Sequence, residues 1–166
     1  MRDPDRRPFL EGQPYRLRVG QRSDGKLLLE FMDRAYRELR PGAELSHLAE
    51  TVRQLWSDGT RLWFVESALP ESLGQSLGCL WLGQAVDQVS GDRYTHVFLL
   101  YVNPVHRRRG LGAALMKRAE AWAIQQNNSQ LGLYVFVDNL PAQTLYRRLG
   151  YSPQATFLQK RLSPPP

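Results

Sequence analysis

The sequence predicts a single α/β domain, and three observations support this fold class. The chain has 166 residues, about the size of one domain built around one hydrophobic core. Hydrophobic residues make up 42% of the chain and charged residues 23%, close to the average of folded globular proteins. Segments with the two-residue period of strands alternate with segments that have the helical period. We therefore expect a mixed sheet flanked by helices.

The domain is expected to span residues 15–162, with a tail at each end. Residues 1–14 mix proline, arginine, aspartate and glycine with little periodicity, which predicts a flexible N-terminal tail. Residues 163–166, "SPPP", predict a short C-terminal tail. No internal repeat or linker divides the region between them.

One strand and two amphipathic helices are predicted first. Apolar and polar residues alternate over residues 15–19, as in a half-buried strand. Residues 26–39 repeat apolar side chains at a spacing of four, and the following "RPG" ends a helix. Residues 45–56 carry a second apolar stripe, which predicts another helix.

Three strands are predicted next. Residues 61–67 and 76–86 are rich in strand-forming residues and are separated by a loop, which predicts an antiparallel pair. Residues 94–102 form a nearly continuous apolar run, which is typical of a strand covered on both faces.

Two helices and two strands are predicted in the last third. Residues 110–126 have apolar side chains at helical spacing, and residues 131–137 form a fifth strand. Residues 139–149 predict a short helix, with Asn139 as its N-cap and a glycine at its end. Residues 156–162 alternate again and predict a closing strand.

The net charge of +6 is concentrated in two regions. Residues 1–22 hold six arginines against three acidic residues, and residues 106–118 hold five basic residues and no acidic one. Such charge suits nucleic acid, an acidic surface or a phosphorylated cofactor, so its position in the fold must decide among them.

Several classes of protein are disfavoured. No apolar run reaches the roughly 18 residues of a membrane helix, and the N-terminus lacks the apolar stretch of a signal peptide. We therefore expect a cytoplasmic protein without a membrane partner. Cys79 is the only cysteine, which excludes an internal disulfide and a cysteine-based zinc cluster, and its strand setting favours a packed core thiol. His47 and His106 have no partner at metal-ligand spacing, so no metal is expected.

The segment "VNPVHRRRGLGAAL" has the order that an anion site needs, a strand followed by a turn and a helix. Free backbone N–H groups at a helix start bind phosphate oxygens, helped by the helix dipole. Gly110 and Gly112 allow the backbone to approach a ligand. The alternative is a solvated basic loop.

Two motifs resemble those of the GCN5-related N-acetyltransferases. Arg107, Gly110 and Gly112 match the R/Q-x-x-G-x-G/A pattern of the loop that binds the pyrophosphate of acetyl-coenzyme A in that family. Residues 137–151, "VDNLPAQTLYRRLGY", are similar to the family's second motif on the helix after the fifth strand. The match is close over residues 97–151, and before that it concerns only the architecture.

The resemblance implies a fold of about six or seven strands flanked by four helices, with the fourth and fifth strands splayed apart around the pantetheine arm. It also implies acetyl-coenzyme A as cosubstrate, with the amide of Leu100 or Tyr101 polarising the thioester carbonyl. The implied cofactor-binding residues are Leu100, Tyr101, Val102, Arg107, Arg108, Arg109, Gly110, Leu111, Gly112, Ala113, Asn139, Ala142 and Tyr146.

Two residues are candidates for catalysis. The resemblance places Tyr146 as the acid that protonates the departing thiolate, and a phenol with a pKa of about 10 can donate near neutral pH. Tyr146 is otherwise a core aromatic residue. His96 is the only titratable group besides tyrosines in residues 94–102, and its pKa near 6.5 suits a base that deprotonates the amine, directly or through water. A histidine simply hydrogen-bonded at a strand end is the alternative. Arg147 and Arg148 meet the phosphates or form a solvated helix face.

These observations favour an enzyme that transfers an acetyl group to a primary amine by direct attack in a ternary complex. A catalytically silent acyl-coenzyme A sensor or scaffold is the alternative. A nucleic-acid-binding module is disfavoured because the arginines adjoin glycines at a helix start. A small amine, an amino-acid derivative and a protein N-terminus all stay open as acceptors, and so does a homodimer.

Overall fold

The computed structural model describes residues 9–160 and residue 162. Most of the two predicted tails, residues 1–8 and 163–166, lies outside this described part. The chain forms two compact units, the first extending to Tyr134 and the second beginning at Val135. The elements are β1 Tyr15–Val19, η2 Arg22–Asp24, α1 Gly25–Leu39, α2 Leu48–Leu55, β2 Arg61–Ser67, η3 Pro70–Ser72, β3 Ser76–Val86, β4 Arg93–Val102, η4 Pro104–His106, α3 Leu111–Gln125, β5 Leu131–Leu133 and α4 Leu140–Arg148.

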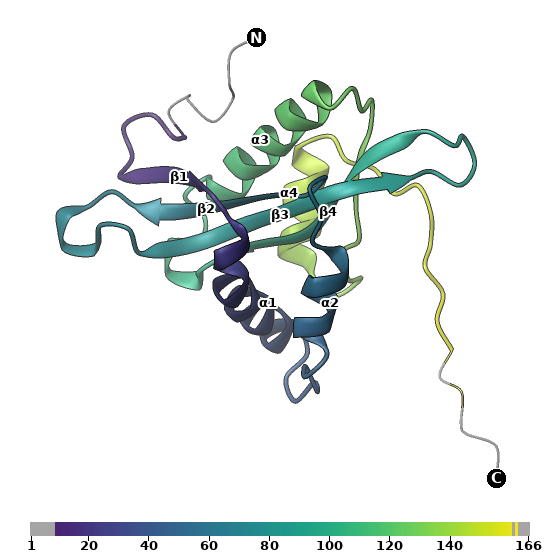
Figure 1. The fold of residues 1–166 in the computed structure, drawn as a ribbon, viewed down its shortest axis with the longest axis horizontal. Helices are drawn as coiled ribbons and strands as arrows, with labels where there is room; N and C mark the ends of the chain where they lie inside the picture. Colours follow the sequence, from purple (N-terminus) through teal and green to yellow (C-terminus); the bar gives the residue numbers. More distant parts are fainter. Residues whose placement is uncertain (1–8, 161, 163–166) are drawn as a thin grey trace. The chain divides into compact units, whose positions relative to one another are not determined.

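The first unit is built on one mixed sheet (Figure 1). Among the described residues the strand order is β1-β2-β3-β4-β5, with antiparallel pairing from β1 to β4 and parallel pairing between β4 and β5. The mixed α/β class and the antiparallel pair of residues 61–67 and 76–86 are confirmed. The described sheet has five strands, fewer than the six or seven expected.

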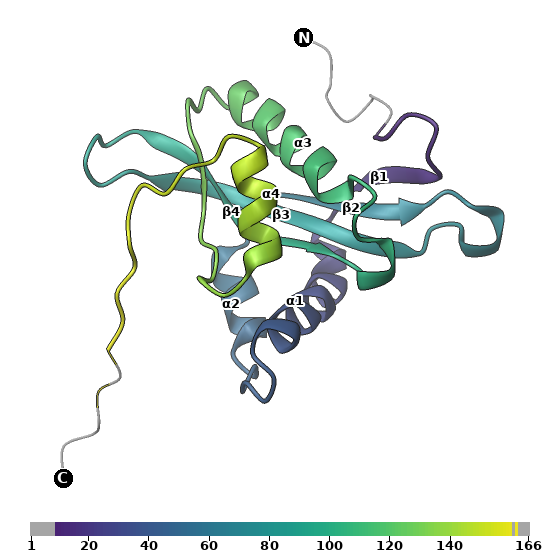
Figure 2. The same cartoon turned by 180° about the vertical axis from the view of Figure 1, so that it is seen from behind.

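Helices cover both faces of this sheet. The two views show α1 and α2 on one face and α3 on the opposite face (Figures 1 and 2). The stripe of α3 that faces the sheet is Leu111, Leu115, Ala119 and Trp122, each at most 5% exposed. This is the stripe that the helical spacing predicts.

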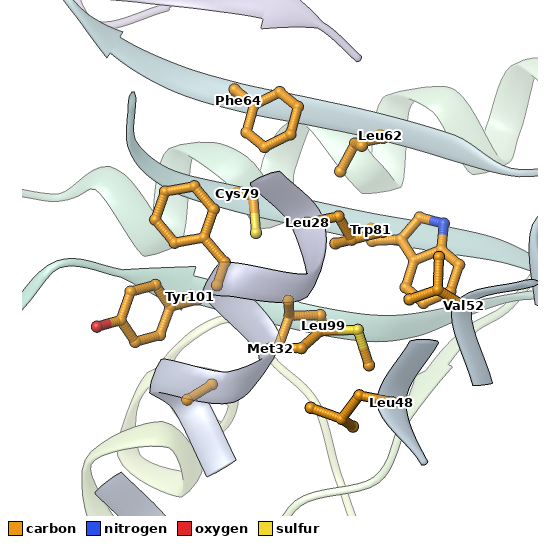
Figure 3. Close-up of a cluster of buried hydrophobic side chains, with 12 residues drawn as sticks. Leu28, Met32, Leu48, Val52, Leu62, Phe64, Cys79, Trp81, Leu99 and Tyr101 are labelled. Atoms are coloured by element: carbon orange, nitrogen blue, oxygen red, sulfur yellow. The ribbon is translucent and has the colours of Figure 1, made fainter. Parts of the chain in front are cut away.

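A hydrophobic cluster joins α1 and α2 to the sheet (Figure 3). Its buried members are Leu28, Phe31, Met32, Ala35, Leu48, Val52, Leu62, Phe64, Cys79, Trp81, Leu99 and Tyr101. Cys79 is a core thiol, as the sequence indicates, and burial raises its pKa well above the usual range. The cluster fixes α1 against the end of β4, where Tyr101 lies.

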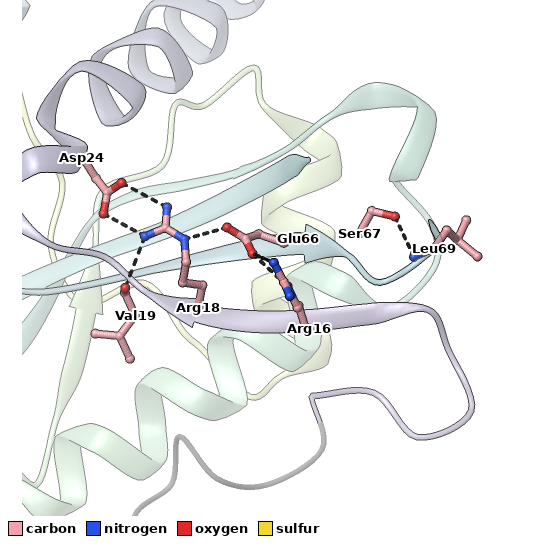
Figure 4. Close-up of polar contacts among 7 residues, drawn as sticks. All are labelled: Arg16, Arg18, Val19, Asp24, Glu66, Ser67 and Leu69. Carbon is pink, nitrogen blue, oxygen red and sulfur yellow. Dashed lines mark hydrogen bonds and ion pairs between the residues drawn. The ribbon is translucent and has the colours of Figure 1, made fainter. Parts of the chain in front are cut away.

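A polar network fixes β1 to β2 and to the start of α1 (Figure 4). The buried carboxylate of Glu66 accepts hydrogen bonds from Arg16 at 2.9 Å and from Arg18 at 2.6 Å. Arg18 also donates to both carboxylate oxygens of Asp24, and its guanidinium lies 4.7 Å from the Phe64 ring centroid. Each side chain of this network therefore has a charged partner, as buried charges require.

The strands β4 and β5 separate after three residue pairs. Thr95, His96 and Val97 pair with residues 131–133, and no β5 partner follows them in the described sheet. A β-bulge lies at the same place, because Trp81 pairs with Leu99 whereas its neighbour Leu82 pairs with Val97. The separation begins where the register of β4 changes.

The fifth strand is shorter than predicted, ending at Leu133 instead of residue 137. The carbonyls of Phe136 and Val137 accept hydrogen bonds from the Gln143 side chain, and the Asn139 N–H also donates to Phe136. These carbonyls thus belong to the turn that leads into α4. An apolar run alone does not distinguish such a turn from a strand.

The second unit contains α4, and its ends follow the prediction. The Asn139 side chain accepts the Ala142 N–H at 3.3 Å, Pro141 lies in the first turn, and Gly150 follows the helix with φ of +91°. The predicted closing strand over residues 156–162 is not formed in its described part, where Leu158 and Leu162 are 85% and 81% exposed. Residue 161 lies outside the described residues.

Candidate active site

The turn between β4 and α3 presents a row of free backbone N–H groups. Within residues 9–160, the amides of residues 108–113 donate no hydrogen bond, and the first bonded amide of the helix is Ala114, to Gly110. A helix leaves its first N–H groups unpaired, and the irregular turn before α3 extends the row. Such a row, at the positive end of the helix dipole, fits a phosphate.

Two left-handed residues give the turn its shape. Gly110 has φ of +83° and Arg108 has φ of +60°. Gly110 is favoured here because a side chain in this conformation is strained. A Cβ built on Gly110 meets nothing within 4 Å, so the space beside the turn is open.

The three arginines of the turn differ in their contacts. Arg107 donates from Nε to the Val102 carbonyl at 2.8 Å. Arg109 donates to the Tyr15 hydroxyl at 3.1 Å. Arg108 is exposed and makes no polar contact with another residue of the described chain. Arg108 and Arg109 are therefore the arginines best placed to supply charge next to the free amides.

The strand β4 leaves one backbone edge free beyond Val97. The Asn103 N–H donates to the Leu77 carbonyl of β3, which makes these two residues a hydrogen-bonded pair. In an antiparallel ladder such pairs alternate, so Leu100 and Val102 direct their backbone groups away from β3, whereas Tyr101 faces β3. The contact between Arg107 and the Val102 carbonyl agrees with this alternation. Leu100 thus has a free N–H on the side where β5 has ended.

His96 lies among aromatic side chains rather than beside a charge. Its ring centroid lies 6.0 Å from that of Tyr94, 5.5 Å from that of Phe98 and 5.1 Å from that of Tyr134. Burial lowers the pKa of His96 below the usual 6.5, so the imidazole is neutral near pH 7. A neutral imidazole is the form that accepts a proton.

Tyr146 and Asn139 lie in the second unit. Burial raises the pKa of Tyr146 to about 12, so its phenol keeps its proton at neutral pH. Its ring packs edge to face with Tyr151, with 5.9 Å between centroids. Asn139 caps α4 through Ala142, and Arg147 and Arg148 are exposed on the same helix.

Glu30, Asp33, Glu66 and Asp87, which the sequence alone cannot rank as residues of an acceptor cleft, have other partners or are exposed. Asp33 pairs with Arg37 on the surface of α1, and Asp87 accepts two backbone N–H groups of its own turn. Glu66 is buried in the arginine network of Figure 4, and Glu30 lies on the exposed face of α1.

The structure instead brings Glu38, which sequence reasoning missed, to the end of β4. Glu38 accepts the Tyr101 hydroxyl at 2.8 Å and pairs with the Arg107 guanidinium at 2.6 Å. Its place near the apolar stripe of α1, seven residues after Phe31, is the only sequence feature that could have indicated a position facing the sheet.

No group of three or more histidine, cysteine, aspartate or glutamate side chains among the described residues could hold a metal ion. No helix in that part of the chain is both long and apolar enough to span a membrane.

The fold and the turn together define a class of protein. A mixed sheet that opens after β4, next to a row of free amides at a helix start, suits a cofactor with a phosphate group and an extended arm. The model of the acetyltransferase (GNAT) family matches residues 28–151. The chain belongs to this family.

Curated relatives agree with this assignment. The chain is 30% identical over 116 residues to a mycothiol acetyltransferase from Amycolatopsis mediterranei, which covers 67% of this chain but only 38% of the relative. It is also 30% identical over 112 residues to an aminoglycoside N(6')-acetyltransferase type 1 from Acinetobacter haemolyticus, with 66% of this chain and 74% of the relative covered. The chain thus spans well under half of the mycothiol acetyltransferase.

Solved structures share the fold. A protein described as a predicted acetyltransferase from Clostridium acetobutylicum, solved with acetyl-CoA, matches with a TM-score of 0.74 at 15% identity, covering 89% of this chain and 96% of that one. An aminoglycoside antibiotic 6'-N-acetyltransferase from Acinetobacter haemolyticus matches with a TM-score of 0.65 at 22% identity, covering 89% and 99%. At these identities the likeness concerns the fold.

Proposed function

We propose that the protein transfers the acetyl group of acetyl-CoA to a primary amine. The observation that carries this proposal is the row of free amides from Arg108 to Ala113 beside the free edge of β4. The diphosphate binds to these amides, with charge from Arg108 and Arg109, and the pantetheine arm lies along the β4 edge. Family membership and a relative's structure solved with acetyl-CoA support this cosubstrate.

The proposed reaction is a direct attack in a ternary complex. The neutral amine nitrogen attacks the thioester carbonyl carbon, a C–N bond forms, and the C–S bond then breaks. The Leu100 N–H, which points away from β3, is placed to stabilise the negative charge that develops on the carbonyl oxygen. Of the two amides that the sequence leaves open for this role, we therefore favour that of Leu100, because the Tyr101 amide faces β3.

The two proton transfers are assigned to Tyr146 and His96. Tyr146 donates its phenolic proton to the leaving thiolate. Burial raises its pKa to about 12, so the phenol carries its proton at neutral pH before it donates. His96, neutral because burial lowers its pKa, takes the proton of the attacking amine, directly or through water. After one turnover the proton moves from His96 to Tyr146 through solvent, which balances the reaction.

The acceptor is proposed only as a primary amine, on a small molecule or on a peptide. Two relatives carry the names of a mycothiol and an aminoglycoside acetyltransferase, so an amine of a small polar molecule is the first class to screen. The aromatic rings around His96 offer a surface for an ammonium group before its deprotonation. A homodimer, which the sequence leaves open, stays untested.

Thiol release tests this proposal. The purified protein is mixed with acetyl-CoA and a panel of aminoglycosides, amino-sugar derivatives and short peptides, and free coenzyme A is measured with a thiol reagent. We expect amine-dependent release by at least one class. Acetyl-CoA binding without release by any amine would favour the silent acyl-CoA sensor instead.

A further inference from the structure

Arg107, Glu38 and Tyr101 form a bridge between α1, β4 and the turn before α3, which we call the Glu38 bridge. One oxygen of Glu38 accepts the Tyr101 hydroxyl at 2.8 Å, and the other accepts Arg107 Nη2 at 2.6 Å. The Arg107 guanidinium also lies 5.5 Å from the Tyr101 ring centroid. Tyr101 is 5% exposed, so the bridge is anchored in the hydrophobic cluster of Figure 3.

The bridge holds Arg107 against the free edge of β4. Arg107 Nε donates at 2.8 Å to the Val102 carbonyl, one of the backbone groups that points away from β3. This carbonyl is therefore occupied, while the backbone groups of Leu100 on the same edge have no strand partner. Arg107 thus marks Val102 as the end of the β4 edge that an extended ligand can pair with.

The charge of Arg107 is also matched locally. The Glu38 carboxylate lies 2.6 Å from the guanidinium, and such a charge-assisted pair fixes its orientation. A neutralised charge attracts a phosphate less than a free one does. Arg108, which has no polar partner in the described chain, and Arg109, whose partner is a neutral hydroxyl, keep their net charge.

We propose that Arg107 is a positioning residue for the pantetheine arm and not a phosphate ligand. Held by Glu38, it closes the β4 edge at Val102 and so sets where the extended arm begins to pair with the strand. The phosphates are left to the free amides and to Arg108 and Arg109. This inference rests on the proposed acetyl-CoA site and assigns different roles to neighbouring arginines within it.

Binding of the two halves of the cofactor, measured separately, distinguishes a positioning role of Arg107 from a role as phosphate ligand. S-acetylpantetheine carries no phosphate, and adenosine 3'-phosphate 5'-diphosphate carries no pantetheine. We expect Arg107→Ala to weaken the binding of S-acetylpantetheine and of acetyl-CoA by a similar factor of about 10, the effect of one lost positioning contact. Binding of the nucleotide half should stay within about twofold, whereas Arg108→Ala should weaken that half. NMR titration covers the weak affinities of the fragments.

Conservative variants distinguish the loss of this contact from a folding defect. Arg107→Gln keeps an N–H donor for Val102 without the charge, so it should recover part of the S-acetylpantetheine binding that Arg107→Ala loses. Glu38→Gln should show the same selective loss in a weaker form, and Glu38→Gln combined with Arg107→Ala should lose no more than Arg107→Ala alone.

The outcomes are distinct. If Arg107→Ala weakens the nucleotide half as much as it weakens acetyl-CoA, Arg107 is a phosphate ligand and the inference is wrong. An unchanged affinity for S-acetylpantetheine overturns it as well. If the unsubstituted protein binds neither half nor acetyl-CoA, the proposed function fails instead.

Discussion

At the scale of single residues, Tyr146 is the proposed acid, by resemblance to the family's second motif. Its pKa is raised to about 12, so near pH 7 the phenol is protonated and can donate to a thiolate. Tyr146→Phe keeps the ring that packs against Tyr151 and removes only the hydroxyl. We expect kcat to fall by about 100-fold, as typical for a lost general acid.

Acetyl-CoA affinity is the control for this variant, and it should stay within about twofold since the ring remains. The measurement is steady-state thiol release at saturating acetyl-CoA, beside calorimetry. An undiminished kcat would show that another group or water protonates the thiolate and would leave Tyr146 as a packing residue.

His96 makes the pH dependence testable. Burial lowers its pKa below 6.5, so the imidazole stays neutral at higher pH and becomes protonated only as the pH falls below that value. If His96 is the base, kcat/KM should fall at low pH as the imidazole becomes protonated, and this fall should be absent in His96→Ala. The substitution should also lower activity at neutral pH by about 10- to 100-fold. The profile is measured from about pH 5 to about pH 9.

An equal profile for His96→Ala and the unsubstituted protein would remove His96 as the base. Tyr94→Phe is the matched control, because it changes a neighbour in the same aromatic group without removing an imidazole. Tyr94→Phe should not change the pH at which kcat/KM falls on the acid side of the profile.

At the scale of elements, the approach of β3 to the end of β4 explains the glycine at position 78. A Cβ built on Gly78 would lie 2.5 Å from the Tyr101 carbonyl oxygen and 3.1 Å from the Val102 Cα, both of which are backbone atoms. Backbone cannot move aside as a flexible side chain does. Gly78→Ala should therefore reduce the free energy of unfolding by about 1 to 3 kcal/mol, the usual cost of overpacking.

Urea denaturation measures this change, with Gly25→Ala as the control. Gly25 begins α1 with φ of −54°, and a Cβ there meets nothing within 4 Å. That substitution should be neutral or should stabilise by up to about 1 kcal/mol, since alanine favours the helix. Equal effects of the two substitutions would contradict the close approach of β3 to the end of β4.

Elements with a strong local pattern were predictable from the sequence. Residues 15–19, 61–67 and 76–86 form strands with the predicted bounds, because their alternation or apolar content and the flanking turns are local properties. The end of β5 was not predictable, because the carbonyls of Phe136 and Val137 accept hydrogen bonds from a side chain of the following helix.

At the scale of the whole molecule, the contacts that sequence reasoning missed join distant parts of the chain. Glu38 meets Tyr101 and Arg107 across separations of 63 and 69 residues, and Glu66 meets Arg16 across 50. No periodicity encodes such pairs. The turn itself was predictable, because its glycines and its place between a strand and a helix are local features, whereas the different contacts of its three arginines appear only in the fold.

The proposed function depends most on the free amides before α3, and a calorimetric titration with acetyl-CoA and with coenzyme A tests them directly. Gly110→Glu places a carboxylate in the open space beside the amides. Gly91→Glu is the matched control, since Gly91 is also left-handed, with φ of +77°, and also has nothing within 4 Å of a built Cβ.

We expect the unsubstituted protein and Gly91→Glu to bind acetyl-CoA alike and Gly110→Glu to bind it at least about 100-fold more weakly, because like charges repel at the phosphate position. No binding by the folded, unsubstituted protein, or equal binding by Gly110→Glu, would contradict a cofactor site at this turn.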